Sequence, residues 1–122
     1  MPIEHEVDGL RDLIITTISG VVGFQELHRA ILGVAQLPGF HPTMGQLVDM
    51  SGCTEIHATY AEVEELARLR PTRAAYRAYV APVAVVFGIA RMYEQFRDDG
   101  RMMVVRTREE GLRWLEQQRQ AP

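Results

Sequence analysis

The residues best suited to chemistry follow a short apolar run near the middle of the chain. Asp49 stands at the end of that run, Ser51 comes just after it, and His57 lies a few positions further on. A carboxylate, a hydroxyl and an imidazole are groups that catalytic sites use. No Gly-x-Ser-x-Gly elbow surrounds Ser51, however, so nucleophilic catalysis is unsupported and no catalytic residue is assigned.

Asp49 has two interpretations. At the carboxyl end of a strand it could act as a general base or bind a polar group of a substrate. A short acid in this position also readily accepts backbone N–H bonds from the loop that follows. We expect the second role, because function has to be argued from a complete site and not from a fold.

The sequence contains no pattern for a metal or a cofactor. The four histidines form no His-x-x-x-His pair, and the single cysteine, Cys53, belongs to no His/Cys cluster. The chain has no lysine, which excludes Schiff-base chemistry and a P-loop lysine. We therefore expect neither a metal nor a cofactor. A single cysteine also excludes an internal disulfide and is typical of a reducing compartment.

The composition is that of one domain, residues 1–122. Hydrophobic residues make up 47% of the chain, which is enough for a core at this length. The net charge of −3 argues against nucleic acid as a partner. We see no secretion signal, and the longest apolar run, 83–87, is too short to cross a bilayer. A cytoplasmic protein without stable membrane insertion is expected.

Hydrophobic periodicity predicts strands and helices in alternation around the central run. Pro82 cannot donate within a central ladder, so we expect it to open a helix. Two capping boxes, Thr59–Glu62 and Thr107–Glu110, mark two further helix starts. The predicted strands cover 3–7, 13–18, 45–50, 76–81 and 102–106, and the predicted helices begin near 24, 59, 82 and 107.

An N-terminal hairpin strand followed by four β-α units predicts an α/β domain with a mainly parallel five-stranded sheet. Asp8–Gly9 is expected to form the hairpin turn, and Ser19–Gly20 to end the second strand. Residues 51–56 are expected to be a loop, and Pro71 is expected to end the second helix.

The segments 47–56, 87–94 and 106–115 together carry a resemblance to a known family. The run Leu47-Val-Asp-Met-Ser-Gly-Cys-Thr-Glu-Ile56 is similar to the central strand of STAS domains, the fold of anti-sigma-factor antagonists. The other two segments resemble the SpoIIAA-like family of small bacterial proteins, often described as STAS/CRAL-TRIO-like. The resemblance covers essentially the whole chain. It implies a STAS-like fold without assigning an activity.

The chain departs from that family at the start of the second helix. Phosphorylatable STAS domains have Asp-Ser-Ser-Gly there, whereas this chain has His57-Ala-Thr-Tyr60. Thr59 is therefore the candidate phosphoacceptor. The departure counts against a partner-switching role.

The functional surface is expected at the carboxyl ends of the parallel strands, where crossover connections leave a crevice. Helix N-termini near Thr59 and Pro82 would favour an anionic head group, and apolar residues of the third helix would hold a tail. The candidate ligand-binding residues are Ser19, Asp49, Ser51, His57, Val83 and Phe87.

Three classes of function follow. The first is a non-enzymatic STAS-like binding module that engages a regulatory protein or a small apolar or anionic ligand. The second is a carrier of a small lipid-like molecule, since CRAL-TRIO-like relatives hold an apolar ligand in the corresponding region. The third is a hydrolase at Asp49, Ser51 and His57. We also expect a homodimer, because helices wound onto one face of the sheet would leave the other face to be covered.

Overall fold

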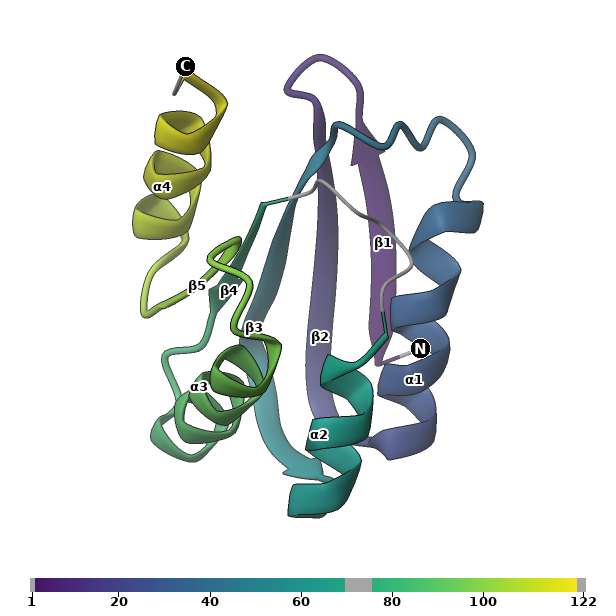
Figure 1. Cartoon of the computed structure of the whole chain (residues 1–122), viewed down its shortest axis with the longest axis vertical. Coiled ribbons are helices and arrows are strands. Elements are labelled where there is room, and N and C mark those ends of the chain that lie inside the picture. The colour runs from purple at the N-terminus through teal and green to yellow at the C-terminus, as the bar shows by residue number, and fades with distance from the viewer. Residues whose placement is uncertain (1, 70–75, 121–122) are drawn as a thin grey trace.

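The structure is a computed structural model that describes residues 2–69 and 76–120 (Figure 1). The strands are β1 (Ile3–Asp8), β2 (Leu13–Gly23), β3 (Gly45–His57), β4 (Arg77–Val80) and β5 (Met102–Val105). The helices are α1 (Phe24–Gly33), α2 (Tyr60–Ala67), α3 (Ala84–Arg97) and α4 (Arg108–Gln120), with a short 3-10 helix, η1 (Val34–Gln36), after α1.

The strands form one sheet in the order of the chain, β1-β2-β3-β4-β5. β1 is antiparallel to β2, and the other neighbours are parallel. The predicted α/β class, with a hairpin strand and four β-α units in a mainly parallel sheet, is confirmed at this level. No helix among the described residues is long and apolar enough to span a membrane.

The order of the strands decides which face each helix covers. Parallel crossovers share one hand, so successive crossovers that advance in one direction place their helices on one face. α1, α2 and α3 are these crossovers, and they pack over the same side of the sheet (Figure 1). α4 follows the last strand and connects to no other, so it is free to pack on the opposite side. We call these two sides the cavity face and the α4 face.

The α4 face is closely packed where Gly111 meets the sheet, whereas a hollow lies between the later part of α4 and the start of β2. Leu13, Leu47, Val80 and Leu115 form one buried cluster on this face. Gly111 brings α4 close to the sheet, since a Cβ at this position would lie 2.9 Å from Cδ1 of Leu47. Real Cβ atoms essentially never lie so close to a neighbouring atom, so any larger residue at this position would force Leu47 or α4 to shift.

α4 covers only part of its face. Over β1 and β2 that side carries Glu4, Glu6 and Thr17, which are exposed. Ile15, which is half-buried, lies on the same side of β2 as Thr17, so the part of this face that α4 leaves uncovered is mixed in character. The homodimer remains a prediction.

Two sequence predictions about β2 and β3 were wrong. β2 continues beyond Ser19–Gly20 to Gly23, and β3 continues through residues 51–56, which were expected to be a loop. The pairing of these strands shifts register between Thr17 and Ser19 and again after Gly20, where φ is +71°. Gly20 therefore marks a bulge within a strand, a second common use of glycine, and not the end of the strand.

The smaller corrections concern turns. The left-handed residue of the β1–β2 turn is Asp12, with φ 57°, and not Asp8 or Gly9. The Asp8 carboxylate instead accepts from the backbone N–H groups of residues 10 and 11. α3 begins at Ala84 with Val83 as its N-cap, so Pro82 precedes the helix. α2 ends at Ala67, and Pro71 lies outside the described residues.

Both capping boxes are confirmed. The Thr59 hydroxyl accepts from the backbone N–H of Glu62 at 3.1 Å, and the Glu62 carboxylate accepts from that of Thr59 at 2.9 Å. Thr107 and Glu110 form the same reciprocal pair at the start of α4.

Candidate functional site

A cavity of about 90 Å³ lies between the cavity face and the three crossover helices. Most of its wall is apolar. Ile18 and Val48 come from the sheet, Leu27 and Ile31 from α1, Leu66 from α2 and Ile89 from α3. The rest of the wall is polar and comes from His5, Thr16, Gln46, Arg77, Tyr79 and Tyr93.

The polar wall includes a hydrogen-bonded row across the strands. Thr16 on β2 is central to it: its Oγ1 lies 2.8 Å from Nδ1 of His5 on β1 and accepts from Nε2 of Gln46 on β3, also at 2.8 Å. Gln46 is in register with Arg77 on β4. Thr16, Gln46 and Arg77 are each less than 9% exposed. Burying so many polar groups costs free energy unless they bond to one another or to something else, so such a row needs a reason.

The row also divides the core on this side of the sheet. One apolar cluster, with Ile18, Val48 and Val86, lies beyond it toward the carboxyl ends of the strands. A second, smaller cluster of Ile14, Val34 and Met44 lies on the other side. These polar side chains bond to one another and not to the free backbone groups at the end of a helix, so they are not capping residues.

His5, whose imidazole contacts Thr16 in this row, is also affected by burial in its protonation. Burial lowers the pKa of the His5 imidazole from its ordinary value. Because the ordinary value is about 6.5, the ring is mainly neutral at pH 7. It is then available as a hydrogen-bonding group and not as a cation.

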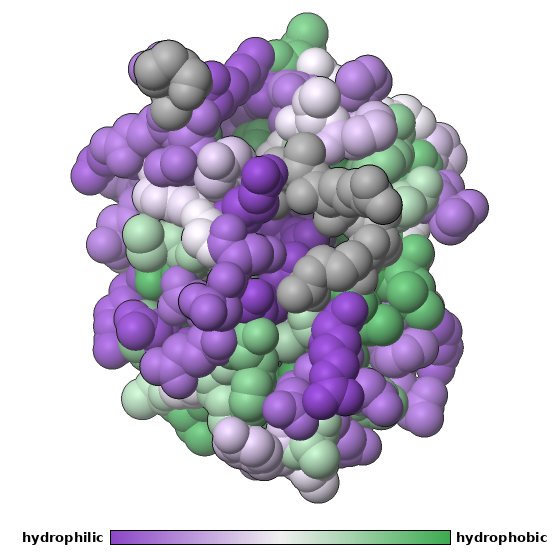
Figure 2. Space-filling view, viewed as in Figure 1, coloured by the Kyte–Doolittle hydropathy of each residue, from purple (hydrophilic) through white to green (hydrophobic). Residues whose placement is uncertain are grey.

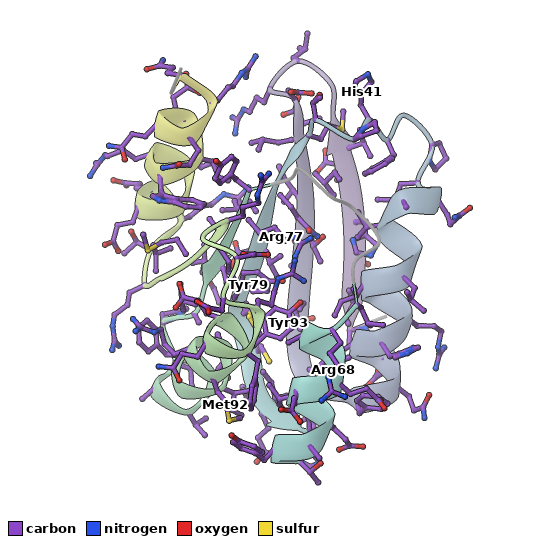
Figure 3. All side chains as sticks on the ribbon, viewed as in Figure 1. His41, Arg68, Arg77, Tyr79, Met92 and Tyr93 are labelled. Atoms are coloured by element: carbon purple, nitrogen blue, oxygen red, sulfur yellow. The ribbon has the colours of Figure 1, made fainter. Side chains whose placement is uncertain are left out.

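A group of tyrosines and arginines adjoins the row. The rings of Tyr79 and Tyr93 are 5.8 Å apart, and Figure 3 shows both beside Arg77, between α3 and the sheet. Burial raises the pKa of the Tyr79 hydroxyl, so it stays protonated. Behind Tyr93, the guanidinium of Arg97 lies 3.4 Å from the Tyr93 hydroxyl and binds the Asp99 carboxylate at 2.9 Å. Arg97 is 6% exposed.

Both arginines, Arg97 and Arg77, lower the pKa of the Asp99 carboxyl group. Partial burial raises the pKa of Asp99, but the hydrogen bonds from the Arg101 backbone and from Arg97, with the charges of Arg97 and Arg77, outweigh this. The pKa therefore lies below its ordinary value, and Asp99 is ionised at neutral pH. Arg77, Arg97 and Asp99 together carry one net positive charge.

Figure 2 shows the outside of the same side of the molecule. Hydrophilic side chains cover its upper left, over α4, and also border a recess near the centre. Hydrophobic side chains gather toward the lower part and the right edge. The surface over the three crossover helices is thus mixed in character and not one continuous apolar patch.

The predicted site residues lie elsewhere: Ser19, Asp49, Ser51, His57, Val83 and Phe87 all stand outside the cavity lining. Asp49 is on the α4 face, beside Leu47 in the alternation of β3. Its carboxylate accepts from the Ser51 backbone N–H at 3.0 Å and binds Arg108 at 2.9 Å. Partial burial raises the pKa of Asp49, but these bonds lower it further, to below its ordinary value. Asp49 thus ties down neighbouring backbone, as expected.

Ser51 and His57 are not brought together. They lie on the same extended strand, and a strand rises about 3.3 Å per residue, so the two side chains are roughly 20 Å apart along it. His57 is exposed and pairs with Glu55 at 2.7 Å. Ser19 is exposed on β2, where it is in register with Gly52. The arrangement that a hydrolase would need is not formed by these residues.

Val83 and Phe87 are at the start of α3, where they pack partly against the core. The guanidinium carbon of Arg106 lies 4.1 Å from the centre of the Phe87 ring, a cation–π contact. Val85 next to them is 58% exposed. Thr59 is exposed and occupied as an N-cap.

The cavity residues could have been found in the sequence from one signal. Gln46 and Arg77 each stand directly before an apolar run, at the start of β3 and β4, and Thr16 follows the apolar start of β2. Gln46 and Arg77 are in register, whereas Thr16 is in register with Val48 and reaches Gln46 diagonally, two residues away. Recognising that these three residues adjoin requires the register of the strands, which the sequence alone does not determine.

Comparison with protein-family models, with curated proteins and with solved structures finds no match to this chain. Among the described residues, no group of three or more His, Cys, Asp or Glu side chains is placed to hold a metal ion. The functional conclusion therefore depends on the cavity itself.

Proposed function

We propose that the protein is a binding module, not an enzyme, which holds a small ligand in the cavity beneath α1, α2 and α3. The observation that carries the proposal is the composition of the wall: a mostly apolar enclosure with a few convergent polar groups, which is the usual form of a ligand site. The resemblance to SpoIIAA-like, STAS-like proteins agrees with a binding role.

The size of the cavity decides between the two kinds of ligand considered from the sequence. Sites for drug-sized ligands are about 300–1,000 Å³, several times larger than this cavity of about 90 Å³. A long acyl chain would fit only if the helices moved apart. A compact ligand is therefore the better proposal, and the lipid carrier becomes the alternative.

The test is to fill the cavity. Ala30 of α1 lines it, and Ala30→Leu adds side-chain volume there with little change in helix propensity. We expect small amphipathic probes (isobutyrate, isobutyramide and isobutanol) to shift the methyl resonances of Ile18, Val48 and Ile89 in the wild type. The shifts should disappear in Ala30→Leu and persist in Gln25→Leu, a control on the exposed side of α1. If none of the probes shifts these methyls, the proposed function is wrong.

A protein partner is the second candidate function, and the surface at the start of α3 favours it. Val85 is 58% exposed beside Phe87, which Arg106 contacts from the solvent side. An apolar patch flanked by arginine is common at protein interfaces. Val85→Asp should abolish such binding without lowering the melting temperature. The homodimer, expected through the sheet face that the crossover helices leave uncovered, is a separate prediction: sedimentation of the wild type checks it, and a monomer at micromolar concentration would contradict it.

A further inference from the structure

The polar groups in the cavity wall are engaged within the chain. Thr16 lies between His5 and Gln46, and its hydroxyl is 2.8 Å from a nitrogen of each. The Tyr93 hydroxyl accepts from Arg97 at 3.4 Å. Among residues 2–69 and 76–120, no buried side-chain nitrogen or oxygen lacks a hydrogen-bond partner. A ligand in the cavity therefore meets polar groups that are already bonded to one another.

The charged groups beside the cavity are engaged as well. Arg97 binds the Asp99 carboxylate at 2.9 Å and donates to the Leu69 carbonyl at 3.2 Å. Arg77 has a partner of its own. Burial lowers the pKa of His5, so its ring is mainly neutral at neutral pH. An ionised ligand would leave water without gaining a free charge to pair with, and burying an unpaired charge is costly.

The rest of the wall and the volume describe the ligand that remains. The apolar part of the wall is aliphatic and includes Ile18, Val48 and Ile89. Water is held in a cavity by two to four polar partners, whereas apolar cavities stay dry and take apolar molecules. A cavity of about 150 Å³ takes benzene, with six carbons, so in proportion about 90 Å³ corresponds to roughly three to five non-hydrogen atoms.

We propose that the ligand is a neutral, apolar molecule of about three to five non-hydrogen atoms, held by contact with the aliphatic wall and not by the polar row. This proposal rests on the proposed function and adds to it the charge, the polarity and the size of the ligand. A molecule this small binds no more tightly than roughly tens of micromolar, so its probes are titrated through the millimolar range.

The experiment compares three probes of one shape. Isobutene, acetone and acetate each have a planar central carbon joined to three other non-hydrogen atoms; the first is apolar, the second dipolar and the third an anion. Each is titrated into the wild-type protein at neutral pH while the methyls of Ile18, Val48 and Ile89 are followed by NMR. We expect isobutene to bind most tightly, acetone at least about tenfold more weakly, and acetate more weakly still, because neither polar probe finds a free partner.

The outcomes separate this proposal from the proposed function. Tightest binding of acetate would show a free positive group in the cavity, and would overturn the neutral ligand while the proposed function stands. Binding of acetone as tight as that of isobutene would overturn the apolar ligand in the same way. If none of the three shifts the methyls, this proposal fails, and the larger isobutyl probes then decide the proposed function.

Two further measurements locate the binding and test the wall. Ala30→Leu, which fills the cavity, should remove the shifts caused by isobutene, and Gln25→Leu on the exposed side of α1 should keep them. Shifts that persist in Ala30→Leu would place isobutene elsewhere and overturn the proposal. In the wild type without any probe, nuclear Overhauser effects between long-lived water and the three methyls should be absent. Their presence would show free polar partners in the cavity and overturn the proposal, even if Ala30→Leu does not fold.

Discussion

The two faces of the sheet are built from the same strands, but the helices pack differently against their central parts. On the α4 face, Leu47 lies so close to a helix glycine, Gly111, that an added methyl group would force it to shift. The residues that alternate along the strands with those of the α4 face point to the cavity face. There Gln46, Val48 and Tyr79 help to line a cavity of about 90 Å³, whose wall includes buried polar groups. One face is closely packed around Gly111, and the other leaves a space that the proposed function assigns to a ligand.

The largest expected effect is on the α4 face. Gly111→Val places two methyl groups where even a Cβ would lie 2.9 Å from Leu47, and we expect it to destabilise the protein by about 3 kcal/mol. Urea denaturation checks this value. Gly88→Ala is the matched control, because Gly88 is also within a helix but has nothing within 4 Å. That change should stabilise by about 0.5–1 kcal/mol.

The next effect is at the charged end of the cavity face. Asp99→Asn leaves Arg97, 6% exposed, without its carboxylate, and should cost about 2 kcal/mol. Asp99 has a folded-state pKa below that of the unfolded chain, about 3.9, so its stabilising contribution is complete above that pH and is lost as the pH falls. Wild type should therefore lose more stability than Asp99→Asn between about pH 5 and about pH 3. Parallel curves for the two proteins would contradict this.

A smaller effect is expected at the N-terminus of α2, one of the helices that enclose the cavity. Thr59 caps this helix, so Thr59→Ala should cost about 1 kcal/mol, and Thr59→Ser or Thr59→Asp little. Thermal melts of the three variants check the order. If Thr59→Asp instead abolished binding to a partner with an unchanged melting temperature, Thr59 would be a regulatory phosphoacceptor and not only a cap.

The smallest effect sharpens the contrast between the faces. Ala30→Leu enlarges a side chain on the cavity face, as Gly111→Val does on the α4 face, yet it has space to fill. We expect a change in unfolding free energy of less than about 1 kcal/mol, in either direction. A loss as large as that of Gly111→Val would show that the cavity face is packed as tightly as the other.

The sequence predicts the arrangement of this fold better than its site. Alternating strand and helix patterns, the capping boxes at Thr59 and Thr107 and the proline before α3 are local signals, and they placed the elements correctly. Gly20 was misread because a glycine that ends a strand and one that forms a bulge look alike in sequence. That error shortened β2. β3 was shortened separately, because residues 51–56, which include Gly52, were expected to be a loop, where a site seemed natural.

The cavity was missed for a different reason. Thr16, Gln46 and Arg77 are distant in sequence, and they come together only because three strands pair, with Thr16 diagonal to Gln46 and Gln46 in register with Arg77. Asp49 drew attention because a carboxylate at a strand end is easy to recognise, but its partners, Ser51 and Arg108, give it a structural role. Recognisable residue types were a poorer guide to the site than polar residues in apolar strands.

The order of the strands in the sheet also bears on how the chain folds. Each strand pairs with the strand that precedes it in the chain, so every pairing closes a segment no longer than one β-α unit. Parallel sheets usually fold slowly because distant segments must meet before any contact rewards them, and this arrangement avoids the longest closures. The sheet can then grow from its N-terminal hairpin one strand at a time while the chain is still being synthesised, with α4 docking last onto strands that are already paired.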